Sequence, residues 1–145
     1  MKKLSKKMWW ILSLTWGLPL TLVGLTTALF LLCCGKRPYR HIYSICFVVG
    51  NNWGGLNLGP ITITSAESAT PHTLNHEFGH SIQNCYFGPL TPFIIAIPSS
   101  TRYWYREWLI RSGRKTYSEL PPYDSIWFEG SATAIGNKYE EAQFD

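Results

Sequence analysis

The stretch TPHTLNHEFGHSIQNCYFGP, residues 70–89, predicts the best-marked helix of the chain. Thr70 is a favourable N-cap, Pro71 fits the first helical position, and Gly88 followed by Pro89 ends a helix. Apolar residues recur at helical spacing, namely Leu74, Phe78, Ile82 and Cys85. We therefore expect a helix between Thr70 and Gly88 that packs on a core through one apolar stripe.

This helix carries the sequence His76-Glu77-Phe78-Gly79-His80. Two histidines at positions i and i+4 lie on the same helix face, so both imidazoles can reach one metal ion. The glutamate that follows the first histidine lies beside the ion, where it can take a proton from water. The pattern predicts Zn²⁺ as cofactor, His76 and His80 as ligands, and Glu77 as general base.

Catalytic zinc requires a third protein ligand and an open position. No histidine follows His80, so the longer three-histidine pattern is absent. Glu129 stands among apolar and small neighbours in WFEGSA, where a carboxylate is either paired or bound to something. We predict Glu129 as the third ligand. Asp124, which resembles a helix cap, and His72, one turn before His76, remain the alternatives.

Two segments before this helix have strand character. Residues 42–49 (IYSICFVV) are β-branched and aromatic, and a turn cluster of Gly and Asn follows them. Residues 56–65 (LNLGPITITS) alternate between apolar and polar from Pro60 onward, and Pro60 marks an edge strand or a strand start. Together they predict a β-hairpin or two neighbouring strands.

Two further helices are expected after the motif helix. Residues 93–97 form an apolar run too short to span a membrane, which indicates core packing or a shallow membrane contact. A helix then follows to about Ser112, and its Trp, Tyr and Arg residues suit either an interfacial helix or an ordinary surface helix. The last helix is expected from Ile126 to about Glu141.

The N-terminal segment from Met8 to Gly35 contains no charged residue. A helix of about 20 apolar residues spans a bilayer, so residues 8–35 predict a single-pass membrane anchor. The basic residues 1–7 and the basic linker 36–41 flank it, and a domain over residues 42–145 follows. Their charges are nearly balanced and lean slightly towards a cytoplasmic N-terminus at the cell membrane.

Composition narrows the classes of partner. The chain has 145 residues, a net charge of +4 and four cysteines. This length allows one domain, and the cysteine positions do not form a disulfide framework. The charge is modest and dispersed, and it suits an anionic membrane surface better than nucleic acid, for which the sequence contains no motif.

The motif followed by a helical Glu129 resembles the gluzincin branch of zinc peptidases in a minimal form. Residues 76–98, with the preceding GGLNLG, also resemble an uncharacterised family of small bacterial membrane proteins. In gluzincins an Asp four residues after the glutamate ligand often orients a histidine ligand. This chain has Thr133 there, whose hydroxyl accepts the hydrogen bond less strongly, so the resemblance implies an outer-shell role for Thr133.

The same resemblance implies that an edge strand before the motif helix pairs with extended substrate. The matching residues are Ile61, Thr62, Ile63 and Thr64. An electrophile-stabilising tyrosine or histidine is also implied, and Tyr123, Tyr103 and Tyr105 are the candidates.

The sequence thus predicts an α+β protein with a transmembrane helix and a small zincin-like domain. We expect a membrane-anchored zinc metalloendopeptidase acting on peptides or membrane-proximal protein segments. The alternative is a non-catalytic protein, either a structural zinc-binding domain or a membrane-anchored interaction module. A closed site with four protein ligands would favour the structural role, because catalytic sites keep one position open.

Overall fold

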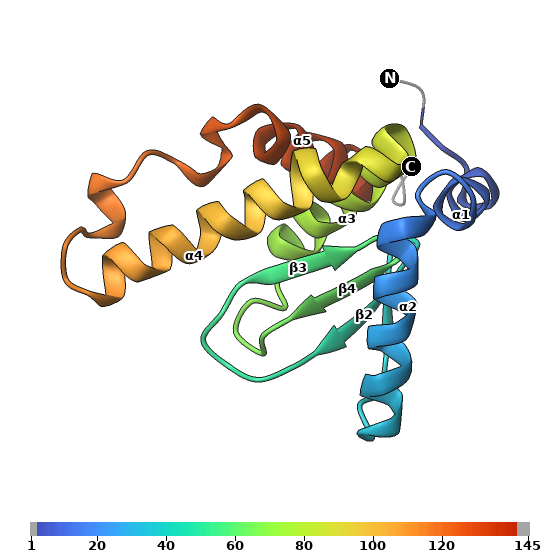
Figure 1. The fold of residues 1–145 in the computed structure, drawn as a ribbon, viewed down its shortest axis with the longest axis horizontal. Coiled ribbons are helices and arrows are strands. Elements are labelled where there is room, and N and C mark those ends of the chain that lie inside the picture. Colours follow the sequence, from blue (N-terminus) through green and yellow to red (C-terminus); the bar gives the residue numbers. More distant parts are fainter. Residues whose placement is uncertain (1–2, 142–145) are drawn as a thin grey trace.

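The computed structural model describes residues 3–141, so the first two residues of the predicted basic N-terminus and residues 142–145 of the predicted domain lie outside the described part. The fold is α+β, as predicted, with helices around one small mixed sheet (Figure 1). The elements are α1 (Lys6–Leu14), α2 (Leu18–Cys33), β1 (Tyr39–His41), β2 (Ser44–Val48), β3 (Gly55–Leu58), β4 (Ile61–Thr64), α3 (Pro71–Phe87), η1 (Gly88–Leu90), η2 (Pro92–Ala96), α4 (Ile97–Arg111), η3 (Tyr117–Glu119), η4 (Tyr123–Ser125) and α5 (Trp127–Glu141).

The motif helix α3 is confirmed, with both of its predicted ends. The Thr70 hydroxyl accepts a hydrogen bond from the Thr73 backbone N–H at 3.3 Å, and Gly88 ends the helix at φ 53°. The helix is buried around its whole circumference rather than along one stripe, because the sheet, α1 and α5 all contact it. Its polar residues therefore lie inside the protein and require internal partners.

Helices α3 and α5 approach each other through glycine. A Cβ atom placed on Gly79 would lie 1.9 Å from the Ala132 carbonyl oxygen, and one on Gly136 would lie 1.8 Å from the Asn75 carbonyl oxygen. No side chain fits in either space, so the two backbones touch at these positions. This contact brings the N-terminal turn of α5, which carries Glu129, next to the motif.

The two predicted strand segments are neighbours, as expected, and they form part of a four-stranded sheet. The strand order is β1-β2-β4-β3, in which β2 and β4 are parallel and the two outer pairs are antiparallel. The sheet side chains alternate between a face covered by α2, which receives Ile61 and Ile63, and a face towards α3.

The prediction that Ile61, Thr62, Ile63 and Thr64 form an edge strand is wrong. These residues make up β4, which pairs with β2 on one side and with β3 on the other. Pro60 starts the strand but does not mark the edge, because the turn at Gly59 folds β3 back alongside β4. The edge strand on this side of the sheet is β3.

The prediction of one continuous helix over residues 8–35 is also wrong. The segment forms α1 and α2, which meet at a bend of 96° around residues 15–17. Pro19 in the first turn of α2 cannot continue the hydrogen bonding of α1, and the Asn84 side chain donates to the Gly17 carbonyl oxygen at 3.2 Å. Among residues 3–141, no single helix has both the length and the apolar character to cross a membrane, although α1 and α2 meet both conditions as a bent pair.

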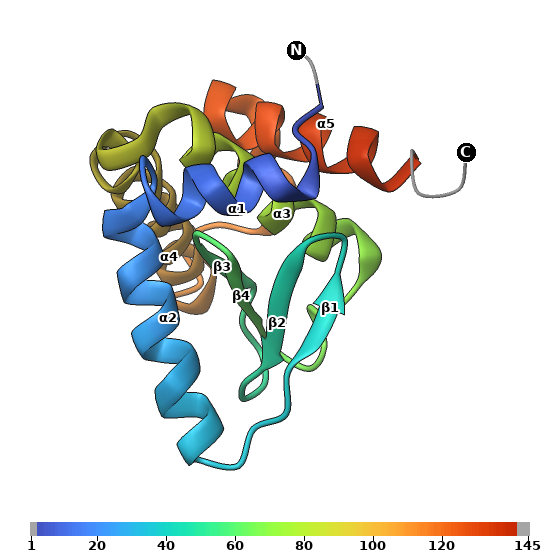
Figure 2. The same ribbon diagram turned by 90° about the vertical axis from the view of Figure 1, so that its right-hand side faces the viewer.

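Both N-terminal helices pack on the rest of the chain (Figure 2). On α1, Trp9 is fully buried in a core cluster with Phe78, Ile82, Cys85 and Tyr139. On α2, Ala28 and Leu31 pack against the sheet in a second cluster with Phe47, Ile61 and Ile63. Residues 6–33 thus contribute to both hydrophobic cores.

The predicted later helices are present as α4, which ends before Gly113, and α5. The apolar run before α4 is wound as the π-helical segment η2. Arg102 and Arg106 on α4 donate to backbone carbonyl oxygens of Pro121, Pro122 and Tyr123. These bonds hold the connection between α4 and α5 against α4.

Candidate metal centre

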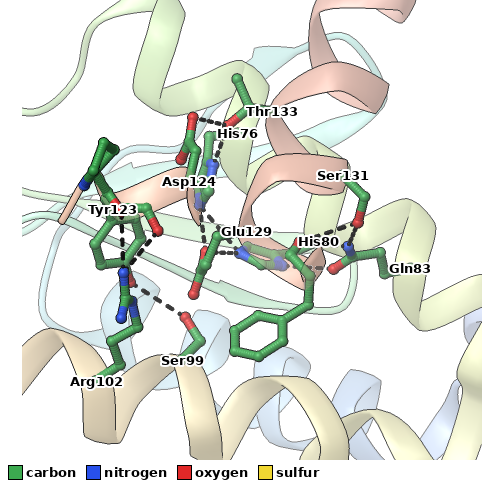
Figure 3. Close-up of polar contacts among 12 residues, drawn as sticks. His76, His80, Gln83, Ser99, Arg102, Tyr123, Asp124, Glu129, Ser131 and Thr133 are labelled. Atoms are coloured by element: carbon green, nitrogen blue, oxygen red, sulfur yellow. Dashed lines mark hydrogen bonds and ion pairs between the residues drawn. The ribbon is translucent and has the colours of Figure 1, made fainter. Parts of the chain in front are cut away.

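The structure brings together the three side chains predicted as metal ligands (Figure 3). The Nε2 atoms of His76 and His80 lie 3.1 Å apart, and each lies 3.0–3.1 Å from Oε2 of Glu129. A tetrahedral zinc ion with bonds of about 2.0–2.1 Å separates its ligand atoms by roughly 3.3 Å. The spacing therefore fits a group that can hold a metal ion.

The environment of Glu129 also fits a cation. The side chain is fully buried, and its Oε1 atom has no hydrogen-bond partner. Burial by itself would raise the pKa of Glu129, but hydrogen bonds with the His76 and His80 rings hold the pKa well below its usual range. The carboxylate is thus kept ionised, with one buried oxygen atom available to a ligand.

The ring of His76 is oriented by a chain of two polar contacts. Its Nδ1 atom lies 2.8 Å from the Thr133 hydroxyl oxygen, which in turn donates to Oδ2 of Asp124 at 3.0 Å. Thr133 has the predicted outer-shell position. Asp124, an alternative for the third ligand, instead supplies a carboxylate to the histidine through the threonine hydroxyl. Asp124 therefore contacts His76 only through the Thr133 hydroxyl, whereas the gluzincin pattern has a carboxylate bonded directly to the histidine.

A separate contact orients His80. Its Nδ1 atom lies 2.7 Å from the Gln83 side-chain oxygen. The Gln83 amide then donates to the Phe128 carbonyl oxygen at 2.7 Å and to the Ser131 hydroxyl at 2.8 Å. This glutamine links the histidine on α3 to the first turn of α5, so both histidine rings are fixed from the helix that carries Glu129.

We expect Thr133→Val to lower zinc affinity by about 10- to 100-fold, because it removes the hydroxyl that bonds His76. Zinc affinity measured by competition with a chelator tests this, with Thr101→Val on the exposed face of α4 as control. In the double variant Thr133→Asp/Asp124→Asn the carboxylate would contact His76 directly, and affinity is expected to return. Equal affinity of Thr133→Val and wild type would contradict an orienting role.

Glu77 lies close enough to the three candidate ligands to interact with them electrostatically. It is 6% exposed, and burial raises its pKa, an effect that the two histidines partly offset. A Cβ atom on Gly55 would lie 2.5 Å from the Glu77 Oε1 atom, so the β3 backbone runs directly past this carboxylate. A glutamate with a raised pKa next to a metal group is suited to proton transfer.

Of the three tyrosine candidates, Tyr123 lies nearest the metal group. Its ring centre is 6.1 Å from that of His76, and burial, reinforced by the charge of Glu129, raises the pKa of its hydroxyl. Arg102 and Arg106 each lie 5.6 Å from its ring centre. The Tyr103 hydroxyl accepts a hydrogen bond from the Gly54 N–H, and Tyr105 is exposed on α4.

A cavity of about 330 Å³ opens onto the group. One wall is the edge strand β3, with Gly55, Leu56 and Asn57. Residues of η2 and the start of α4, including Ile95 and Ser99, also line the cavity, as do Tyr123, His76, Glu77 and His80. His72 lines the cavity as well but is not one of the three converging side chains, so the prediction that ranked it behind Glu129 agrees with the geometry.

Comparisons of the chain with protein-family models, with curated proteins and with solved structures found no match. What can be said about function therefore depends on the residues and the geometry of this centre.

Three features of the centre were not predicted from the sequence. The contact between Gln83 and His80 could have been predicted, because Gln83 lies three residues after His80 and thus on the same side of the helix. The role of Asp124 depends on the path of the chain between α4 and α5, and that of Gly79 on the crossing of α3 and α5. Neither is encoded in a local pattern.

Proposed function

We propose that the chain is a zinc-dependent peptidase. The observation that carries the proposal is the placement of Glu77 beside a buried His76, His80 and Glu129 group at the base of an open cavity. A structural metal site has no need of a base next to the ion, and it closes the coordination with a fourth protein ligand. Within residues 3–141, the metal group comprises three side chains.

A zinc ion in this group would supply Lewis-acid polarisation of a carbonyl group and activation of water. In this proposal the Glu77 carboxylate would accept a proton from the attacking water and later donate it to the leaving amine.

The substrate in this proposal is an extended peptide, bound along β3. The edge of this strand borders the cavity, and Gly55 brings its backbone next to Glu77. Main-chain pairing with an edge strand binds peptides with little dependence on sequence. A peptide paired to β3 would run past Glu77, and Tyr123, whose ring centre lies 6.1 Å from that of His76, is our candidate donor to its carbonyl oxygen.

We expect Glu77→Gln to retain zinc and to lower the rate of peptide hydrolysis by about 10²- to 10⁴-fold, since it removes the general base. The test compares cleavage of an unstructured peptide library by the zinc-loaded full chain and by the variant, with products identified by mass spectrometry. Glu141→Gln, at an exposed position near the end of α5, is the control and should cleave like wild type. Zinc-loaded wild type that cleaves no peptide, or Glu77→Gln that cleaves equally well, would refute the proposal.

A further inference from the structure

Helices α1 and α2 present an outward surface that is largely apolar and carries no charged residue from Met8 onward. We define the outer face by six residues that are 37–66% exposed, namely Met8, Ile11, Leu22, Leu25, Leu29 and Phe30. Both helices lie along the right-hand side of the molecule in Figure 1 and face the viewer in Figure 2. Exposed apolar surface of this extent indicates a binding site.

Three threonine hydroxyls on this part of the chain are satisfied by the backbone of the preceding helical turn. Thr15, Thr26 and Thr27 each donate to the carbonyl oxygen four residues earlier, at 2.7–2.8 Å. A hydrocarbon environment requires that such groups be satisfied internally, and these bonds meet that requirement.

Charges at the ends of the two helices support lipid as the occupant. Lys6 and Lys7 begin α1, and Lys36 and Arg37 follow α2, all of them exposed. Basic residues at the border of an apolar surface attract anionic lipid headgroups. Trp16 lies at the bend between the helices and is 51% exposed, and indole rings favour the membrane interface.

The inner sides of the same helices fix the topology. The Trp9 indole N–H donates to the Ser81 hydroxyl at 2.8 Å, and the Leu4 backbone N–H donates to the Tyr139 hydroxyl at 2.5 Å. On α2, a Cβ atom on Gly24 would lie 2.1 Å from the Leu58 carbonyl oxygen. The first residues are thus packed on α3 and α5, and a bilayer cannot lie between the N-terminus and the metal centre.

We propose that the outer face inserts into one leaflet of an anionic membrane, and that the chain does not cross the bilayer. The N-terminus and the metal centre then lie on the same side, in contrast to the single-pass topology predicted from the sequence. An apolar helix face of this kind lies in the membrane plane, buried about 5–10 Å deep. The inference does not depend on the proposed peptidase activity.

The topology is tested by thiol labelling of the full chain in sealed membrane vesicles of one orientation. The exposed Cys33 and Cys34 are changed to serine, and a single cysteine is introduced at Lys3 or at Lys115, both exposed. A membrane-impermeant maleimide is expected to label both positions from the same side and neither from the other. Labelling from opposite sides would establish a crossing and overturn the inference.

The lipid contact is tested with the purified full chain and vesicles of phosphatidylcholine and phosphatidylglycerol. Leu29→Glu/Phe30→Glu is expected to reduce the vesicle-bound fraction at flotation by at least about 10-fold, while Tyr105→Glu, exposed on α4, leaves it unchanged. Near-ultraviolet circular dichroism checks that each variant is folded. A wild-type chain that does not float and instead forms a dimer, as measured by light scattering, would assign the outer face to a second copy. Neither experiment measures hydrolysis, so its failure is distinct from failure of the peptidase proposal.

Discussion

Replacing Glu129 with glutamine is expected to lower zinc affinity by at least about 10³-fold. Loss of a residue that only bonds to a metal ligand lowers metal affinity by about 10- to 100-fold. A larger loss is expected here, because Glu129 is a candidate ligand itself and carries the only negative charge among the three side chains. The amide retains the size of the carboxylate but replaces one oxygen atom by an NH₂ group, which cannot accept from a histidine or bind a cation.

Elemental mass spectrometry of the purified proteins measures this effect. Wild type is expected to carry close to one zinc ion per chain and Glu129→Gln almost none, whereas Glu67→Gln, at an exposed position, should match wild type. Retention of zinc by Glu129→Gln would show that the third ligand lies elsewhere. Asp124 would then be the residue to test, because it accepts a hydrogen bond from the Thr133 hydroxyl that contacts His76.

Replacing Gly79 with alanine is expected to destabilise the protein by about 3 kcal/mol or more, and to lower its melting temperature by roughly 10 °C. The added methyl group would lie 1.9 Å from the Ala132 carbonyl oxygen and 2.5 Å from the carbonyl carbon. Because these are backbone atoms, the clash can be relieved only by moving α5 away from α3. Such a movement would also separate Glu129 from His76 and His80.

The sign of this effect makes the test decisive. In a helix without such a contact, glycine to alanine stabilises by about 1 kcal/mol through helix propensity alone. Melting is followed by circular dichroism in the presence of a chelator. A melting temperature of Gly79→Ala above that of wild type would therefore show that the two helices are not in backbone contact. Gly136→Ala should behave like Gly79→Ala, since it meets the Asn75 carbonyl oxygen at the other end of the same crossing.

The motif helix and the pairing of its two histidines could be predicted because the relevant signals are local. The Thr70 cap, Pro71 and Gly88 define the ends of α3 within a few residues, and the spacing of His76 and His80 follows from the helix period. Glu129 could be predicted as well, although it is far away in sequence, because a lone carboxylate among apolar residues requires a partner.

The sheet order and the N-terminal bend were not predictable by the same means. A proline at position 60 is equally consistent with the start of a strand and with an edge strand, and only the pairing of β3 with β4 decides between the two. Over residues 8–35, an uncharged sequence indicates burial in an apolar environment but does not specify whether lipid or protein provides it. Here the inner sides of α1 and α2 are covered by protein, as Trp9 and Leu31 show.

The contact between Leu4 and Tyr139 joins residues that are 135 positions apart. At a synthesis rate of roughly 5–20 residues per second, Tyr139 is made roughly 7–27 s after Leu4. Throughout that interval the core around Trp9 lacks Tyr139, whereas the sheet residues that cover the inner side of α2, such as Phe47 and Ile63, are made earlier. The core around α1 is thus completed only when the end of α5 is made.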